Sequence, residues 1–152
     1  MSNWSLERTA RFLPYVVLVA TFDRAVIGPM LITMGEDFDV DLTTITLSTS
    51  AYLLCYGLAQ PMWGLISDRL GRIATLQLAL VCAAVMDLVS VVPMSIEAFI
   101  AVRALAGVTM AGVFPTAVIF LGDTITSAQK RQSAIASLQS GVAIGLTLGT
   151  VL

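Results

Sequence analysis

Four charged side chains, those of Asp23, Arg24, Asp87 and Arg103, lie inside long apolar segments of the sequence. A charge at the centre of a bilayer costs about 2.5–3.5 kcal/mol on insertion scales, so such residues usually face a cavity or a partner. A buried carboxyl group can exchange its charge for a proton, and a guanidinium group pairs readily with carboxylate or phosphate. We therefore interpret these four residues as candidates for proton coupling or substrate binding, with polar contact between helices as the alternative for Asp87.

The segments that carry these charges are long enough to cross a membrane. Hydrophobic residues make up 57% of the sequence and charged residues only 12%, with a mean hydropathy of +0.91, whereas soluble domains contain about 25% charged residues. A membrane helix needs about 20 mostly apolar residues. The sequence predicts an all-α, polytopic transmembrane helix bundle within residues 1–152, with four full spans and part of a fifth at about 12–34, 44–66, 74–92, 98–121 and 133–152.

Polar aromatic side chains recur on one face of the second predicted span. Tyr52, Tyr56 and Gln60 are spaced four residues apart, so they form one row on a helix. Such a row suits either the wall of a cavity or hydrogen bonds between helices. Both interpretations remain open from the sequence.

Small residues form comparable rows on the fourth and fifth predicted spans. Gly107 and Ala111 follow Arg103 at intervals of four, and Gly141, Gly145 and Gly149 repeat that interval. Small residues at this spacing allow two membrane helices to approach closely. We expect both rows to pack against neighbouring helices.

The charged residues between the predicted spans are sorted by sign. One set of loops is basic and the other is acidic; the basic residues are Arg8, Arg11, Arg69, Arg72, Lys130 and Arg131, and the acidic ones are Glu36, Asp37, Asp39, Asp41 and Glu97. Basic loops usually stay on the cytoplasmic side. The sequence therefore predicts a multi-pass protein of the plasma membrane with a cytoplasmic amino terminus.

Several other classes of function lack support in the sequence. The net charge of −2 and the isoelectric point near 4.8 give no basic surface for nucleic acid. The sequence contains no histidine, and Cys55 and Cys82 stand alone in apolar runs. We therefore expect no metal site, no cofactor and no enzymatic activity.

Three motifs resemble those of a known family. The run Gly64-Leu65-Ile66-Ser67-Asp68-Arg69-Leu70-Gly71-Arg72 resembles the cytoplasmic loop signature of the Major Facilitator Superfamily. Arg103-Ala104-Leu105-Ala106-Gly107 is similar to its second signature, and Phe22-Asp23-Arg24 with Gly28-Pro29 to its first helix. The resemblance covers essentially the whole chain.

The resemblance implies a fold of about twelve helices in two halves, with substrate bound between the halves and alternating access by rocking. It implies that Asp68, Arg69 and Arg72 form a cytoplasmic gate. It assigns Arg103 to proton coupling and Asp23 to protonation or substrate binding. The glycine row resembles a signature of antiporters, although Thr150 stands where that signature has proline, and Ile73 replaces a basic residue of the loop signature.

The leading functional hypothesis is proton-coupled transport of a small organic solute, by efflux or import. The lipid bilayer, the solute, protons and a missing carboxy-terminal half would be its partners. One alternative takes organic anions as substrates recognised by Arg24, as in organic-anion transporters that this chain resembles. Another takes the chain as a truncated membrane protein without transport activity of its own, because its gate residues lack an opposing half.

Overall fold

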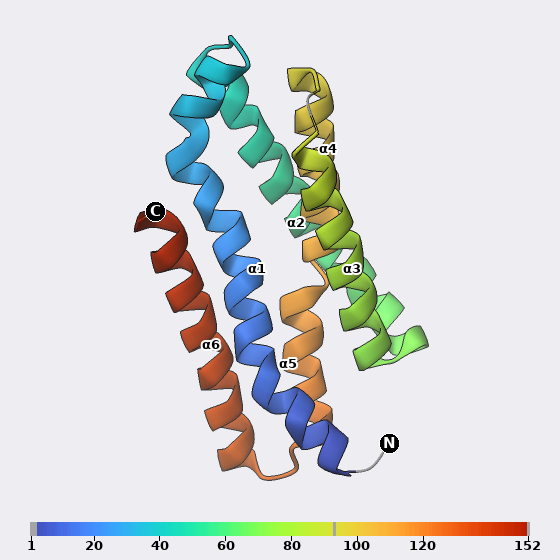
Figure 1. Cartoon of the computed structure of the whole chain (residues 1–152). Helices are drawn as coiled ribbons and strands as arrows, with labels where there is room; N and C mark the ends of the chain where they lie inside the picture. The colour runs from blue at the N-terminus through green and yellow to red at the C-terminus, as the bar shows by residue number, and fades with distance from the viewer. Residues whose placement is uncertain (1–2, 93, 152) are drawn as a thin grey trace.

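The computed structural model describes residues 3–92 and 94–151, with side chains from residue 8 onward. The described chain consists of six helices, as Figure 1 shows: α1 (Asn3–Asp37), α2 (Leu42–Leu70), α3 (Arg72–Ser90), α4 (Ile96–Met110), α5 (Val113–Thr124) and α6 (Ala128–Val151). They form five stretches long and apolar enough to cross a membrane, because α4 and α5 belong to one stretch. The predicted all-α transmembrane bundle is confirmed.

The helices extend beyond the predicted spans. α1 contains 35 residues and continues through Pro14 and Pro29, and α2 begins just after Asp41. The hydroxyl of Thr44 donates a hydrogen bond to the Asp41 carboxylate, which lowers the pKa of that carboxyl group. α6 has 24 residues, enough to cross the bilayer, whereas the sequence predicted only part of a span from residue 133. Residue 152, the predicted end of that span, lies outside the described residues.

The fourth span is interrupted in its middle. A turn at residues 111–112 separates α4 from α5, where the sequence predicted one continuous span over 98–121. Pro115 explains the break, because its nitrogen carries no hydrogen for the carbonyl of Ala111 and its ring crowds that carbonyl. The indole of Trp63 donates a hydrogen bond of 2.6 Å to the carbonyl of Val108 just before the turn.

Two helix pairs account for most of the packing. α1 lies along α6 and α2 lies along α4, with α3 against α4 and α5. At both main contacts a glycine faces the neighbouring backbone. Gly107 abuts the carbonyl of Tyr52, and Gly141 abuts the carbonyl of Pro14. Gly145 and Gly149 continue the second contact along α1, so a side chain at any of these glycines would collide with the neighbouring helix.

Large apolar side chains point away from the bundle. Leu58 of α2 and Leu88 of α3 are 73% and 72% exposed. A soluble protein of this size would cover such groups with polar residues. In a bilayer these faces contact hydrocarbon, so their exposure is the expected arrangement.

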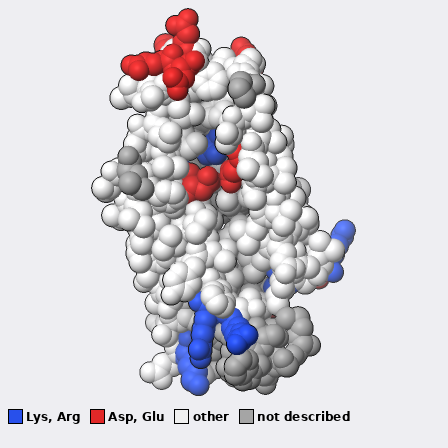
Figure 2. Space-filling view, viewed as in Figure 1, with Lys and Arg blue, Asp and Glu red and all other residues white. Residues whose placement is uncertain are grey.

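The charged ends of the bundle are of opposite sign. Acidic side chains gather where α1 meets α2, at the top of Figure 2, and basic side chains lie at the other end. The sorting predicted from the loops is therefore also a separation in space. The distance between the two ends is spanned by the apolar helices.

The contact between Gly107 and Tyr52 yields a test of this packing. We expect Gly107→Ala to lower the free energy of unfolding by about 1–3 kcal/mol, because the added methyl group would overlap the backbone of α2. Thermal unfolding in detergent micelles measures the change. Gly57→Ala is the matched control, since no atom lies within 4 Å of its added carbon. Equal melting temperatures for the two variants would contradict this packing.

Candidate functional site

Three of the charged residues predicted to be functional meet in the middle of the bundle. Asp23 comes from α1, Asp87 from α3 and Arg103 from α4, and each carboxylate lies within the electrostatic field of Arg103. Figure 2 shows acidic and basic side chains together at mid-height, surrounded by uncharged surface. Helices far apart in the sequence thus deliver one cation and two acids to one place. We refer to Asp23, Asp87 and Arg103 as the charge cluster.

The polar atoms of the charge cluster are not fully paired. Arg103 is 3% exposed, and its Nε atom has no hydrogen-bond partner in the structure. The Oδ2 atom of Asp23 is likewise buried without a partner. A buried polar atom without a partner is costly, so it usually marks a site that binds something or changes state. Both atoms are therefore available to a proton, a water molecule or a solute.

An aromatic ring supports the buried guanidinium group. The Cζ atom of Arg103 lies 4.7 Å from the centroid of the Tyr52 ring, which is a cation–π contact. Gly107 makes this contact possible, because one turn beyond Arg103 it lets α4 approach the backbone of Tyr52. The small residue and the cation therefore act together, although the sequence assigned one to packing and the other to function.

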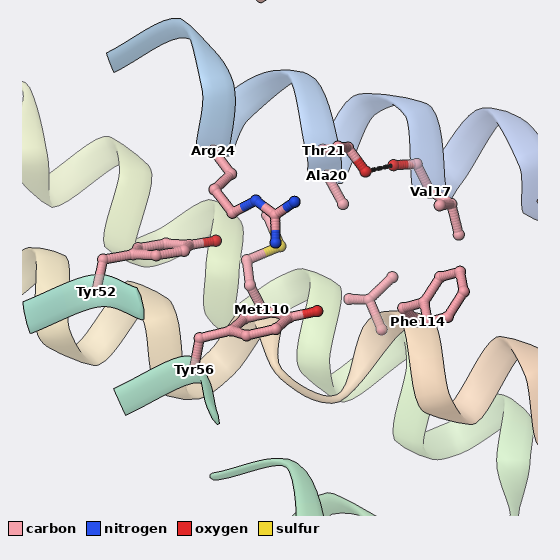
Figure 3. A pocket seen from close by; sticks show the side chains of 9 residues that line it. Val17, Ala20, Thr21, Arg24, Tyr52, Tyr56, Met110 and Phe114 are labelled. Carbon is pink, nitrogen blue, oxygen red and sulfur yellow. Dashed lines mark hydrogen bonds between the residues drawn. The ribbon is translucent and has the colours of Figure 1, made fainter. Parts of the chain in front are cut away.

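Arg24 points to a different place from its neighbour Asp23. Its Cζ atom lies 5.6 Å from the centroid of the Tyr56 ring, and it lines a cavity of about 30 Å³, which is room for one or two water molecules. Figure 3 shows the Arg24 side chain reaching from α1 toward Met110, beside the two tyrosine rings. The other lining residues are Val17, Ala20, Thr21, Val113 and Phe114.

Tyr52 and Tyr56 connect the cavity to the charge cluster. Their rings are nearly parallel, at 11°, with centroids 6.2 Å apart. Each ring contacts one arginine, so the tyrosine pair lies between Arg24 and Arg103. The structure does not bring Gln60 to this place: the residue is half-buried two turns away from Tyr52 and does not line the cavity.

The loop signature forms an ionic cluster at the basic end of the bundle. Arg72 is bonded to Asp68 at 2.6 Å, to Asp123 at 3.0 Å and to Ser67 at 2.9 Å. Gly71 has φ +84°, a conformation that glycine adopts at little cost, and it turns the chain from α2 into α3. Arg69 is exposed, and Gly64 has open space around it.

Asp123, at the end of α5, was missed from the sequence. Its contact with Arg72 joins residues 51 positions apart, which local spacing does not reveal. One signal was present: Asp123 is the only acid in a loop whose other charges are Lys130 and Arg131. A single acid in a basic cytoplasmic loop is a candidate partner for another basic loop.

The sequence from residue 15 to residue 152 matches the family described as the Major Facilitator Superfamily. The chain belongs to the Major Facilitator Superfamily. The match includes every residue of the charge cluster, the tyrosine pair and the loop signature. The family indicates a transport protein rather than an enzyme, and its members are multi-pass proteins of membranes.

Curated relatives have names that agree with this family. The chain is 31% identical over 136 residues to an MFS-type transporter, ppz2, of Metarhizium majus, covering 89% of this chain and 23% of the relative. It is 30% identical over 135 residues to the multidrug efflux pump LfrA of Mycolicibacterium smegmatis, covering 89% and 27%. A putative tartrate transporter of Agrobacterium vitis is 28% identical over 146 residues, covering 93% and 33%. The chain thus spans about a quarter to a third of the length of these relatives.

The ionic cluster around Arg72 yields a test of its strength. Asp68 and Asp123 are well exposed, so we expect Asp123→Asn to lower the free energy of unfolding by at most about 1 kcal/mol at low salt. The difference should disappear in about 1 M salt, which shortens the screening length to about 3 Å. Thermal unfolding at both salt concentrations measures it, with Asp39→Asn as the control. A loss that is unchanged by salt would contradict a screened surface contact.

Proposed function

We propose that this chain is the amino-terminal part of a secondary transporter that couples the movement of a small organic solute to protons by alternating access. The observation that carries this proposal is the charge cluster: two carboxyl groups and an incompletely paired arginine in the middle of an apolar bundle. Charged groups in that position are costly, so they are expected to serve transport.

Proton coupling follows from the cost of a buried charge. A carboxylate in apolar surroundings is unfavourable unless it is paired or takes up a proton. Asp23 would take up a proton from one side of the membrane and release it to the other. In its ionised form it is attracted to Arg103, and in its neutral form it is not. Protonation thus changes the attraction between α1 and α4, which gives the proton a direct effect on the arrangement of the helices.

Arg103 keeps its charge through this cycle. A guanidinium group is effectively always protonated in proteins, so it serves as a fixed positive charge for either carboxylate. The ring of Tyr52 stabilises that charge while both acids are neutral. We propose Asp87 as the second acid, which interacts with Asp23 and Arg103 in the same cluster.

A second candidate substrate class is favoured by the surroundings of Arg24. Its cavity is lined by a guanidinium group and by the side chains of Thr21, Tyr52 and Tyr56, and no carboxylate is among the described lining residues. That arrangement suits a solute with a carboxylate or phosphate group. Among the relatives, one is named for tartrate and another for multidrug efflux, so the family names support both classes.

We assign transport to a protein of the relatives' length. The site between two halves requires residues that the relatives have beyond the matched region, and we propose that the gate of Asp68, Arg69 and Arg72 engages that second half. The 152 residues alone, inserted into vesicles, are expected to show no solute flux. We further propose a plasma-membrane location with the amino terminus in the cytoplasm, which the basic end of the bundle supports.

Replacing Asp23 tests proton coupling. In the full-length protein reconstituted into liposomes, we expect Asp23→Asn to abolish transport driven by a pH gradient, because the amide cannot exchange a proton. Exchange of labelled solute without a gradient should persist. Asp39→Asn, which removes an acid at the end of the bundle, is the matched control. Gradient-driven transport at the normal rate in Asp23→Asn would remove this residue from the mechanism.

Replacing Arg24 separates the two substrate classes. If a solute anion binds this guanidinium group, Arg24→Gln should raise its KM by about ten-fold or more, since a hydrogen bond to a charged group contributes about 1.5–3 kcal/mol. Transport of tartrate and of a lipophilic cation is compared in the same vesicles. An unchanged KM for the anion, with a changed one for the cation, would reject the anion hypothesis.

Cysteine labelling tests the orientation. Asp39→Cys and Lys130→Cys are introduced separately after Cys55 and Cys82 have been replaced by alanine. We expect a membrane-impermeant maleimide to label position 39 in intact cells and position 130 only after lysis. The opposite pattern would overturn the proposed orientation.

A further inference from the structure

Two adjoining grooves lie at the basic end of the bundle, away from the charge cluster. The larger, of about 760 Å³, runs between α1 and α6, and the smaller, of about 390 Å³, continues it toward the loop before α6. They share the residues Ala10, Arg11 and Ile125. We call them together the α1–α6 groove. Their volumes are in the range of about 300–1,000 Å³ that small-molecule sites occupy.

The charge of the α1–α6 groove is of one sign. Arg8, Arg11 and Lys130 line it, and no aspartate or glutamate is among its described lining residues. Thr126, Ser127 and Ser137 add hydroxyl groups. The other basic site at this end is different, because Arg72 is already bonded to Asp68 and Asp123. The groove is therefore the place at this end where cations converge without a carboxylate among them.

The polarity of the groove changes along the direction of the membrane normal. Arg8, Arg11, Phe12 and Tyr15 follow one face of α1, with the cations nearer the end of the helix and the aromatic rings one turn deeper. Phe12 and Tyr15 are 64% and 66% exposed. On α6, Lys130 precedes Ala134 by one turn, so the facing helix has the same order of cation first and small apolar residue next.

We propose that the α1–α6 groove binds the headgroup of an anionic phospholipid from the adjacent leaflet. Arg11 and Lys130 would contact the phosphate, and an acyl chain would lie along Phe12, Tyr15 and Ala134. A phospholipid combines a negative phosphate with an apolar chain at this depth, and both parts match the groove. Basic pockets between membrane helices on the cytoplasmic side bind such headgroups. Only the choice of leaflet rests on the orientation proposed above.

Lipid binding by single-charge variants tests this site. The purified protein in detergent is titrated with dioleoyl phosphatidylglycerol or dioleoyl phosphatidylcholine, and bound lipid is counted by native mass spectrometry. We expect preferential binding of phosphatidylglycerol, and Lys130→Gln should weaken it about five-fold. Arg131→Gln removes the same charge from the next residue, outside the groove lining, and should have a smaller effect. Equal effects of the two variants, or equal binding of the two lipids, would overturn the proposal.

A second pair of variants keeps the charge constant. Ala134→Leu should fill the groove and weaken phosphatidylglycerol binding, whereas Ala136→Leu, on the exposed side of the same helix, should not. Melting temperatures of all variants identify any that are misfolded. Inorganic phosphate is added as a competitor: displacement of the lipid only at high ionic strength supports the lipid assignment. Saturable displacement by millimolar phosphate at constant ionic strength would instead assign the groove to a free anion.

Discussion

The cost of placing charge in hydrocarbon constrains this structure more than any other interaction. Arg103 cannot lose its charge, so its surroundings must stabilise it inside the bundle. They do so with the ring of Tyr52 and the fields of Asp23 and Asp87, while Gly107 allows the required approach of α4 to α2. The tight helix packing and the charge cluster thus depend on each other, and neither is explained by apolar contact alone.

The same constraint explains how the rest of the molecule is arranged. Acidic and basic side chains are kept at opposite ends, and uncharged side chains cover the faces between them. The glycine row of α6 brings that helix against α1, which carries Asp23 and Arg24. At the basic end, carboxylates neutralise Arg72, whereas the α1–α6 groove keeps its positive charge. The two basic sites are therefore suited to different partners.

Much of the fold could be predicted from the sequence, because hydropathy and loop charge report directly on the membrane. The long apolar runs located all five membrane spans, and the intramembrane charges pointed to Asp23, Arg24, Asp87 and Arg103. Contacts between distant helices could not be predicted. Helical spacing placed Gln60 in one row with Tyr52, but it gives no information on where the cavity ends. Asp123 pairs with Arg72 across 51 residues, and the effect of Pro115 on α4 and α5 depends on backbone geometry.

The central claim is that hydrocarbon surrounds the apolar faces while the charges are enclosed within the bundle. Spin labels at Val81 and Val85, on the exposed face of α3, test it in lipid bilayers after Cys55 and Cys82 have been replaced. Collisions with oxygen, which concentrates in hydrocarbon, are compared with collisions with a water-soluble nickel chelate. The structure predicts that oxygen dominates at both positions and that the chelate dominates at Asp39. Dominance of the chelate at Val81 and Val85 would contradict the account.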